Sequence, residues 1–323
     1  MDNKTIYKKT LGFSLRRALW DILAFLILAV ACGAGFLIAE KASDKGLIGL
    51  GIGAVLGIIV IVILLRYVSY TYKAGQIAMM TRGVVEGELP EDVIGEGKKV
   101  VKERFATVAL FFAATGIIKG IFNQIGRGIT KLGESVGGDT GNAVGSAIST
   151  AIQVLVSYLC DCCLGWVFYR KEVKAGKATC EGAVLFFKHG KTLAKNMGRI
   201  FGMGLASLVV IAGVFGGIAY AVLSRFPVFF ERLARELAEA AARTETDLPA
   251  FLQDPATLVL IAAALVGVII WSIIHSVFVR PFVLTGVLRN YLESGMNDIP
   301  DEAAFRVLDG KSSKFKKLHA EAA

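Results

Sequence analysis

The stretch Leu47–Leu65 reads LIGLGIGAVLGIIVIVILL and contains no charged side chain. A helix rises about 1.5 Å per residue, so a stretch of this length crosses the roughly 30 Å hydrocarbon core of a bilayer. Three further stretches of about 20 residues or slightly more have the same apolar character; they are Leu19–Ala39, Phe201–Leu223 and Thr257–Val279. Together the four stretches predict an all-α integral membrane protein.

Two weaker stretches raise the predicted number of spans to six. Ala143–Tyr169 is apolar apart from scattered polar residues, whereas Ala106–Ile125 is uninterrupted only as far as Ile118. If both cross the membrane and both termini lie inside, 27 of the 36 Lys and Arg residues fall inside, as the positive-inside rule requires. We therefore expect six transmembrane helices as three hairpins, with amphipathic interfacial helices, in the cytoplasmic (inner) membrane of a prokaryote. Whether 106–125 spans fully is left open.

Short sequence echoes suggest that the three hairpins are repeats. A Gly-Lys pair follows each pair of stretches, at Gly97, Gly190 and Gly310, and GELPED at 87–92 is echoed by GMNDIPDE at 295–302. Parallel internal repeats are a known architecture of transporters. The pattern predicts one membrane domain over 1–323, with hairpins at 8–96, 97–189 and 190–309 and a cytoplasmic tail at 310–323.

Composition supports a membrane protein and argues against a nucleic-acid-binding one. The chain is 54% hydrophobic and 20% charged, whereas soluble domains are nearer 45–50% apolar and about 25% charged. The formal charge is +9, but the basic residues flank apolar stretches, where anionic inner-leaflet lipid explains them. The N-terminus resembles a signal peptide, yet its apolar run continues through Ala39, so we expect an uncleaved first span.

Three ionisable residues in the apolar stretches are candidate transport residues. Asp161 lies nine residues before Arg170, which predicts a depth of about 14 Å, near the bilayer midplane. An ionisable group at that depth is a functional candidate by default. Asp21 and His275 lie nearer the predicted cytoplasmic boundary, where an Asp21–His275 pair could relay protons because histidine titrates near neutral pH.

Cysteines surround Asp161 in the run Cys160-Asp161-Cys162-Cys163. Thiolates and a carboxylate could hold a soft metal ion, but adjacent residues of one helix point in different directions. We therefore favour cysteines that pack as small side chains, and expect no metal and no cofactor. Cys180 falls in a predicted cytoplasmic segment, where we expect an accessible thiol.

Interfacial helices and glycine faces complete the predicted architecture. Apolar residues at helical spacing over 118–136 and 229–243 predict amphipathic helices on the outer surface. Inside, the segment 182–199 predicts a basic helix suited to anionic headgroups, through Lys188, Lys191, Lys195 and Arg199. Small residues spaced by four predict close helix packing at Gly53–Gly57, Gly213–Gly217 and Gly141–Gly145–Ser149.

The C-terminal third resembles the end of choline transporter-like proteins. The resemblance rests on Phe186-Phe187-x-x-Gly190 and Asn196-Met197-Gly198-Arg199 before two apolar stretches, and on Tyr291-Leu292-Glu293 after them. The whole layout is similar to that of uncharacterised prokaryotic multi-pass families with basic elbow helices. Both resemblances imply a multi-pass membrane protein.

Two functions remain open at this point. The repeats and Asp161 favour movement of an ion or small solute across the membrane. The low number of charges within the stretches favours a non-catalytic scaffold or assembly subunit that binds anionic lipid and self-associates as a homo-oligomer. The sequence has no nucleophile–base–acid set and no zinc-protease helix, so we do not expect an enzyme.

Overall fold

The computed structural model describes residues 1–43, 46–106, 112–113, 115–121, 123, 141–188, 190–243, 249–310 and 312–322. Within these ranges the chain is 89% helical and contains no β-strand, which confirms the all-α prediction. The contacts divide it into two compact units: Met1–Ile200 with Arg280–Ala323, and Phe201–Val279. The division into three hairpin repeats stays a prediction.

Among the described residues, four helices are long and apolar enough to cross a membrane, and each overlaps one of the four clear stretches of the sequence. They are Asn3–Ala42, Ile48–Val85, Gly198–Leu223 and Pro255–Asn297. The fifth stretch forms α6 (Gly141–Tyr169), whose described apolar part is the shorter Gln153–Tyr169. Part of the sixth stretch, Ala106–Ile125, falls outside the described residues, as does most of the predicted amphipathic helix over 118–136. Six spans therefore remain a prediction.

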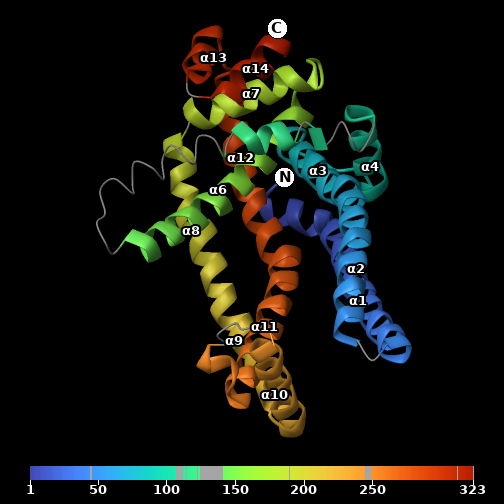
Figure 1. Cartoon of the computed structure of the whole chain (residues 1–323). Helices are drawn as coiled ribbons and strands as arrows, with labels where there is room; N and C mark the ends of the chain where they lie inside the picture. The colour runs from blue at the N-terminus through green and yellow to red at the C-terminus, as the bar shows by residue number, and fades with distance from the viewer. Residues whose placement is uncertain are drawn as a thin grey trace. The chain divides into compact units, whose positions relative to one another are not determined.

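In the first unit, α1 (Asn3–Ser43) and α2 (Gly46–Val68) form a closely packed hairpin (Figure 1). A Cβ atom added to Gly53 would lie 2.1 Å from the carbonyl oxygen of Ala31, and one added to Gly57 would lie 3.1 Å from the Ala31 Cβ. The predicted packing face is confirmed, since only glycine permits such an approach at Gly53. Large apolar side chains such as Leu37 and Ile63 are exposed on the hairpin, as lipid-facing residues require.

The first four turns of α1 belong to the packed interior of this unit. Ile6 and Phe13 are fully buried, and the Gln76 side-chain nitrogen donates to the Thr10 carbonyl oxygen at 3.2 Å and to the Ser14 hydroxyl at 2.7 Å. The uncleaved first span stays a prediction.

A three-helix core lies beyond the α1–α2 hairpin. The helix α2 continues through a π-helical segment, η1 (Ser69–Lys73), into α3 (Ala74–Val85), which packs with the last turns of α6 and with α12 (Arg280–Asn297). A Cβ atom at Gly165 of α6 would lie 2.5 Å from a Leu288 methyl of α12 and 3.0 Å from the Thr81 hydroxyl of α3. The helix α4 (Val93–Arg104) covers α3.

The C-terminal residues form packed helices. The helices α7 (Ala175–Lys188), α13 (Glu302–Asp309) and α14 (Ser313–Ala322) share a hydrophobic cluster that includes Cys180, Phe305 and Phe315. Cys180 is 1% exposed, so the expected accessible thiol is wrong. Its position on the apolar face of α7, against α13 and α14, is the reason.

The second unit is a helical hairpin with a covering helix. The hairpin consists of α9 (Gly213–Leu223) and α11 (Pro255–Ile274), and α10 (Pro227–Arg243) covers it. The other elements, in chain order, are α8 (Gly190–Ser207, which begins in the first unit), η2 (Leu208–Ala212), η3 (Ala250–Leu252) and η4 (His275–Val279). Phe230 and Ala234 of α10 pack on Leu258 and Val259 of α11. The helix predicted over 229–243 is confirmed, and its position on the outer surface stays a prediction.

The glycine contact of the second unit differs from the prediction. A Cβ at Gly267 would lie 2.5 Å from the Ala212 carbonyl oxygen and 3.0 Å from the Gly216 Cα. A Cβ added to Gly213 or Gly217 would meet no neighbouring atom within 4 Å. Successive residues of a helix are turned by about 100°, so Gly216 faces α11 and Gly217 does not. The side-chain surroundings of the third predicted face, Gly141–Gly145–Ser149, lie outside the described residues.

Candidate functional site

Asp161 is held between two basic side chains from other helices. The Lys73 ammonium lies 2.7 Å from one carboxylate oxygen, and the Arg280 guanidinium lies 2.7 Å from the other. The Asp161 side chain is 4% exposed, while those of Lys73 and Arg280 are 31% and 25% exposed. We call Lys73, Asp161 and Arg280 the charged cluster. Its carboxylate is buried, and its two basic side chains are partly exposed.

Side chains of α6 hold Arg280 in place. Arg280 donates to the Ser157 hydroxyl at 2.7 Å, and its guanidinium lies 5.3 Å from the centre of the Tyr158 ring. Ser157 is one helical turn before Asp161, so the two side chains share one face of α6. Hydrogen bonds, charge and a cation–π contact therefore fix the guanidinium.

A third basic residue of the first unit belongs to the same electrostatic neighbourhood. Arg17 of α1 is within interaction range of Asp161 and Arg280, and also of Asp21, one turn further along α1. Two of the predicted residues, Asp21 and Asp161, thus both lie within electrostatic range of Arg17. Nothing in the sequence singles out Arg17, Lys73 or Arg280, because each resembles an ordinary basic residue flanking an apolar stretch.

The neighbours of Asp161 bear on its predicted depth. Arg280 directly follows the apolar stretch Thr257–Val279, whereas Lys73 lies eight residues beyond the end of Leu47–Leu65. The midplane position, which follows from counting back from Arg170, stays a prediction. The last turns of α6 pack within the α3–α6–α12 core.

His275 lies in the second unit, beside a serine and a tryptophan. Its ring nitrogen Nδ1 is 3.2 Å from the Ser207 hydroxyl, which also accepts a 3.1 Å hydrogen bond from the Trp271 indole. His275 begins the π-helical segment η4, and Ser207 directly precedes η2; such segments are frequent at functional sites. Because Asp21 belongs to the first unit, the Asp21–His275 pair stays a prediction.

The cysteines of α6 are packing residues. Cys162 and Cys163 are fully buried, and the Cys163 thiol donates to the Thr179 carbonyl oxygen of α7 at 3.6 Å. A Cβ added to Gly182 would lie 2.7 Å from the Cys163 sulfur. Over the described ranges, no three His, Cys, Asp or Glu side chains are arranged to hold a metal ion.

The predicted lipid-facing basic residues have different surroundings. Lys188, in the last turn of α7, lies 2.6 Å from an Asp298 carboxylate oxygen, and this hydrogen bond raises the pKa of the lysine. Arg199 is exposed, with its guanidinium 3.2 Å from the position of a Cβ at Gly286. The side chains of Lys191 and Lys195 lie outside the part of the chain that the structure describes.

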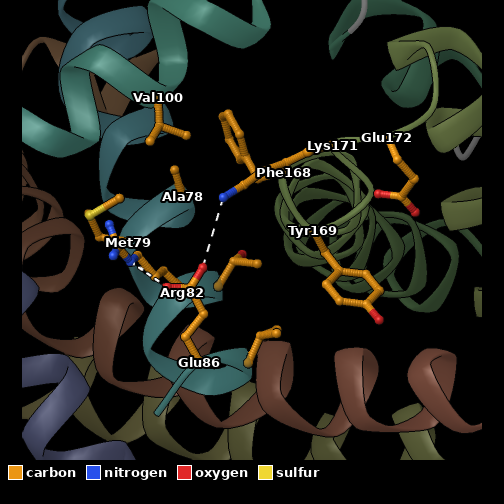
Figure 2. A pocket seen from close by; sticks show the side chains of 11 residues that line it. Ala78, Met79, Arg82, Glu86, Val100, Phe168, Tyr169, Lys171 and Glu172 are labelled. Atoms are coloured by element: carbon orange, nitrogen blue, oxygen red, sulfur yellow. Dashed lines mark hydrogen bonds and ion pairs between the residues drawn. The ribbon is translucent and has the colours of Figure 1, made fainter. Parts of the chain in front are cut away.

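A cavity of about 210 Å³ lies between α3, α4 and the end of α6 (Figure 2). Val100 and Phe168 contribute apolar walls, and Glu86 is contacted by Arg82 at 2.7 Å and approached by Lys171 at 3.9 Å. Ligand pockets usually have about 300–1,000 Å³. The cavity is smaller, and its charges already neutralise one another, so the charged cluster is the stronger candidate.

No protein-family model, curated protein or solved structure matches this chain. The resemblance to choline transporter-like proteins therefore gains no support from known sequences or folds. The site has to be interpreted from its own geometry.

Proposed function

We propose that the protein moves an ion or a small solute across the cytoplasmic membrane, and that the charged cluster closes the path at its inner side. The observation that carries the proposal is the position of Asp161, a buried carboxylate of one helix bound by basic side chains of two others. Ionisable residues within membrane-spanning helices pair with one another and mark substrate and ion pathways.

The order of elements supports a repeat on which such a path could be built. In both α2–η1–α3–α4 and α11–η4–α12–α13, an apolar helix passes through a π-helical segment into a second helix, and a proline-containing turn leads to the next. The Asp92 carboxylate caps α4, and the Asp301 carboxylate caps α13. Lys73 ends η1 and Arg280 follows η4, so two corresponding places supply the cations that hold Asp161.

The six-span arrangement is part of this proposal. In it, the second span of each hairpin extends inward, as α3, the end of α6, and α12. The three extensions pack together; α6 and α12 contribute Asp161 and Arg280 to the charged cluster, and η1 contributes Lys73 directly before α3. Separation of these extensions would open the inner side, and the π-helical segments give two of them a place to adjust.

Bilayer conductance tests the proposal without knowledge of the solute. Purified protein in planar bilayers is compared with Asp161→Asn, which removes the charge, and Asp161→Glu, which keeps a carboxylate. We expect low conductance for the wild type and Asp161→Glu, and raised conductance for Asp161→Asn because the contact no longer closes. A folded Asp161→Asn protein with wild-type conductance would refute the proposal.

A membrane scaffold is the second candidate, favoured by the exposed apolar surface of the first hairpin. Leu19, Leu37 and Ile63 are each 67% exposed, and such a surface suits anionic membrane lipid and a second copy of the chain. Mass photometry in mild detergent separates the candidates. A stable oligomer that Leu37→Ser disperses, together with unchanged conductance in every Asp161 variant, would favour the scaffold.

A further inference from the structure

We infer that the charged cluster binds a phosphate- or carboxylate-bearing anion, which competes with Asp161 for Lys73 and Arg280. The claim that this anion is the transported solute rests on the proposed function. The claim that the charged cluster binds an anion rests only on the charges and exposed fractions of its side chains.

Basic side chains predominate around Asp161 among the described residues. Arg17, Lys73 and Arg280 are basic, whereas Asp161 and Asp21 are the acidic groups named with them. Lys119 adds further positive charge, because it is within interaction range of Cys160, the residue before Asp161. An excess of positive charge in a partly desolvated site is unfavourable, and a bound anion relieves it.

The basic side chains of the charged cluster are more exposed than its carboxylate. The carboxylate of Asp161 is almost completely buried, but about a quarter to a third of each basic partner is exposed. In the inferred site, an anion binds Lys73 and Arg280 over this exposed part of their side chains. A guanidinium offers five donors in a planar fork that matches phosphate and carboxylate oxygens, and an ammonium adds a point charge beside it.

Two sources could supply this chemistry. Arg280 directly follows the apolar stretch Thr257–Val279, which is the level expected for lipid headgroups at an inner leaflet, so an anionic lipid could present its phosphate there. A free anion in solution presents the same group. The test therefore needs one arm for each source.

The solution arm uses isothermal titration calorimetry with inorganic phosphate against chloride at matched ionic strength, in nanodiscs of phosphatidylcholine. We expect Lys73→Gln to weaken phosphate binding about tenfold and Asp161→Asn to tighten it about tenfold, each about 1.4 kcal/mol. Tighter binding follows because the neutral amide of the Asp161→Asn variant would no longer compete for the cations. The control, Lys99→Gln, removes an exposed charge of α4 and should leave binding unchanged.

The lipid arm repeats the titration in nanodiscs that contain phosphatidylglycerol. If phosphate binding is lost there, while the variants keep the expected order of phosphate affinity in phosphatidylcholine, the occupant is a lipid headgroup. Unchanged binding identifies a free anion. Either result supports the site.

A stability measurement covers the case in which Asp161→Asn folds poorly. Phosphate should raise the melting temperature of Asp161→Asn more than that of the wild type, and should not do so in the Lys73→Gln, Asp161→Asn double variant. The inference would be overturned if phosphate changed the melting temperature of all variants equally. It would also be overturned if Asp161→Asn bound phosphate no better than the wild type. If phosphate binding changes in the variants as expected but bilayer conductance does not, transport is refuted and the anion site stands. If conductance changes as expected but phosphate binding does not, the anion site is refuted and transport stands.

Discussion

Asp161 shows how one residue can depend on three helices. Its carboxylate accepts from Lys73 and Arg280, and removal of one partner from a buried ion pair costs about 3–5 kcal/mol. Since both cations are partly exposed, we expect Asp161→Asn to destabilise the protein by about 3 kcal/mol, at the low end of that range. Thermal unfolding in nanodiscs measures the change.

The matched control for this prediction is Ser157→Ala. It removes one hydrogen bond from Arg280 and leaves the ion pair intact, so the expected loss is about 1 kcal/mol. Equal losses in the two variants would mean that the charge of Asp161 contributes little.

Cys180 gives a second prediction at this scale. Burial raises the pKa of its thiol to about 12, and the thiolate is the form that reacts with maleimides. In a variant with Cys180 as its one cysteine, we expect negligible modification of the native protein from pH 7 to pH 9. Denaturant should restore the reaction, and rapid modification of the folded protein would contradict the burial.

The sequence pointed to Asp161 and not to its partners, for a physical reason. A carboxylate inside an apolar stretch is conspicuous, because charge is costly there. Arg280 stands at the end of an apolar stretch and Lys73 a few residues beyond one, where basic residues are common. Their role depends on how α3, α6 and α12 pack, which no local pattern of residues records.

At the scale of elements, the α1–α2 hairpin depends on glycine at particular faces. A Cβ at Gly53 would lie 2.1 Å from a carbonyl oxygen, whereas a Cβ added to Gly51 would meet no neighbouring atom within 4 Å. We expect Gly53→Leu to separate the helices and destabilise the hairpin by at least about 1–3 kcal/mol, the usual range for overpacking. Gly51→Leu should be close to neutral, because its side chain would point away from α1.

The melting temperatures of both variants, reconstituted in the same lipid, check this prediction. The second unit offers an equivalent comparison, since Gly267 contacts the backbone of the opposite helix and Gly213 has open space around it. Similar stability of Gly53→Leu and Gly51→Leu would mean that the hairpin is not held at this contact.

The elements differ in how well the sequence predicted them. Long uncharged stretches identify spans reliably, because length and apolarity together leave few alternatives, and α10 followed from its helical spacing. The end of α6 was harder to interpret. A short apolar helix is consistent with a span or with a buried core, and only the packing against α3 and α12 shows that its last turns are core.

At the scale of the whole molecule, four and six spans make different predictions for one segment. Both place the termini on the same side, but they put residues 126–140 on opposite sides. We expect Lys131→Cys, in a background without other cysteines, to react with an impermeant maleimide only from outside the cell, because six spans expose this segment there. Reaction only from the cytoplasmic side would reduce the number of spans to four.

The central claim is that the charged cluster is a contact that opens, and Cys160 is a native probe beside it. In oriented vesicles with the other cysteines replaced, the rate of Cys160 modification by an impermeant methanethiosulfonate is measured from the cytoplasmic side, with and without Asp161→Asn. The account predicts slow modification in the parent protein and much faster modification in Asp161→Asn, because loss of the ion pairs admits water. Equal rates in the two folded proteins would show that the cluster is a fixed structural link.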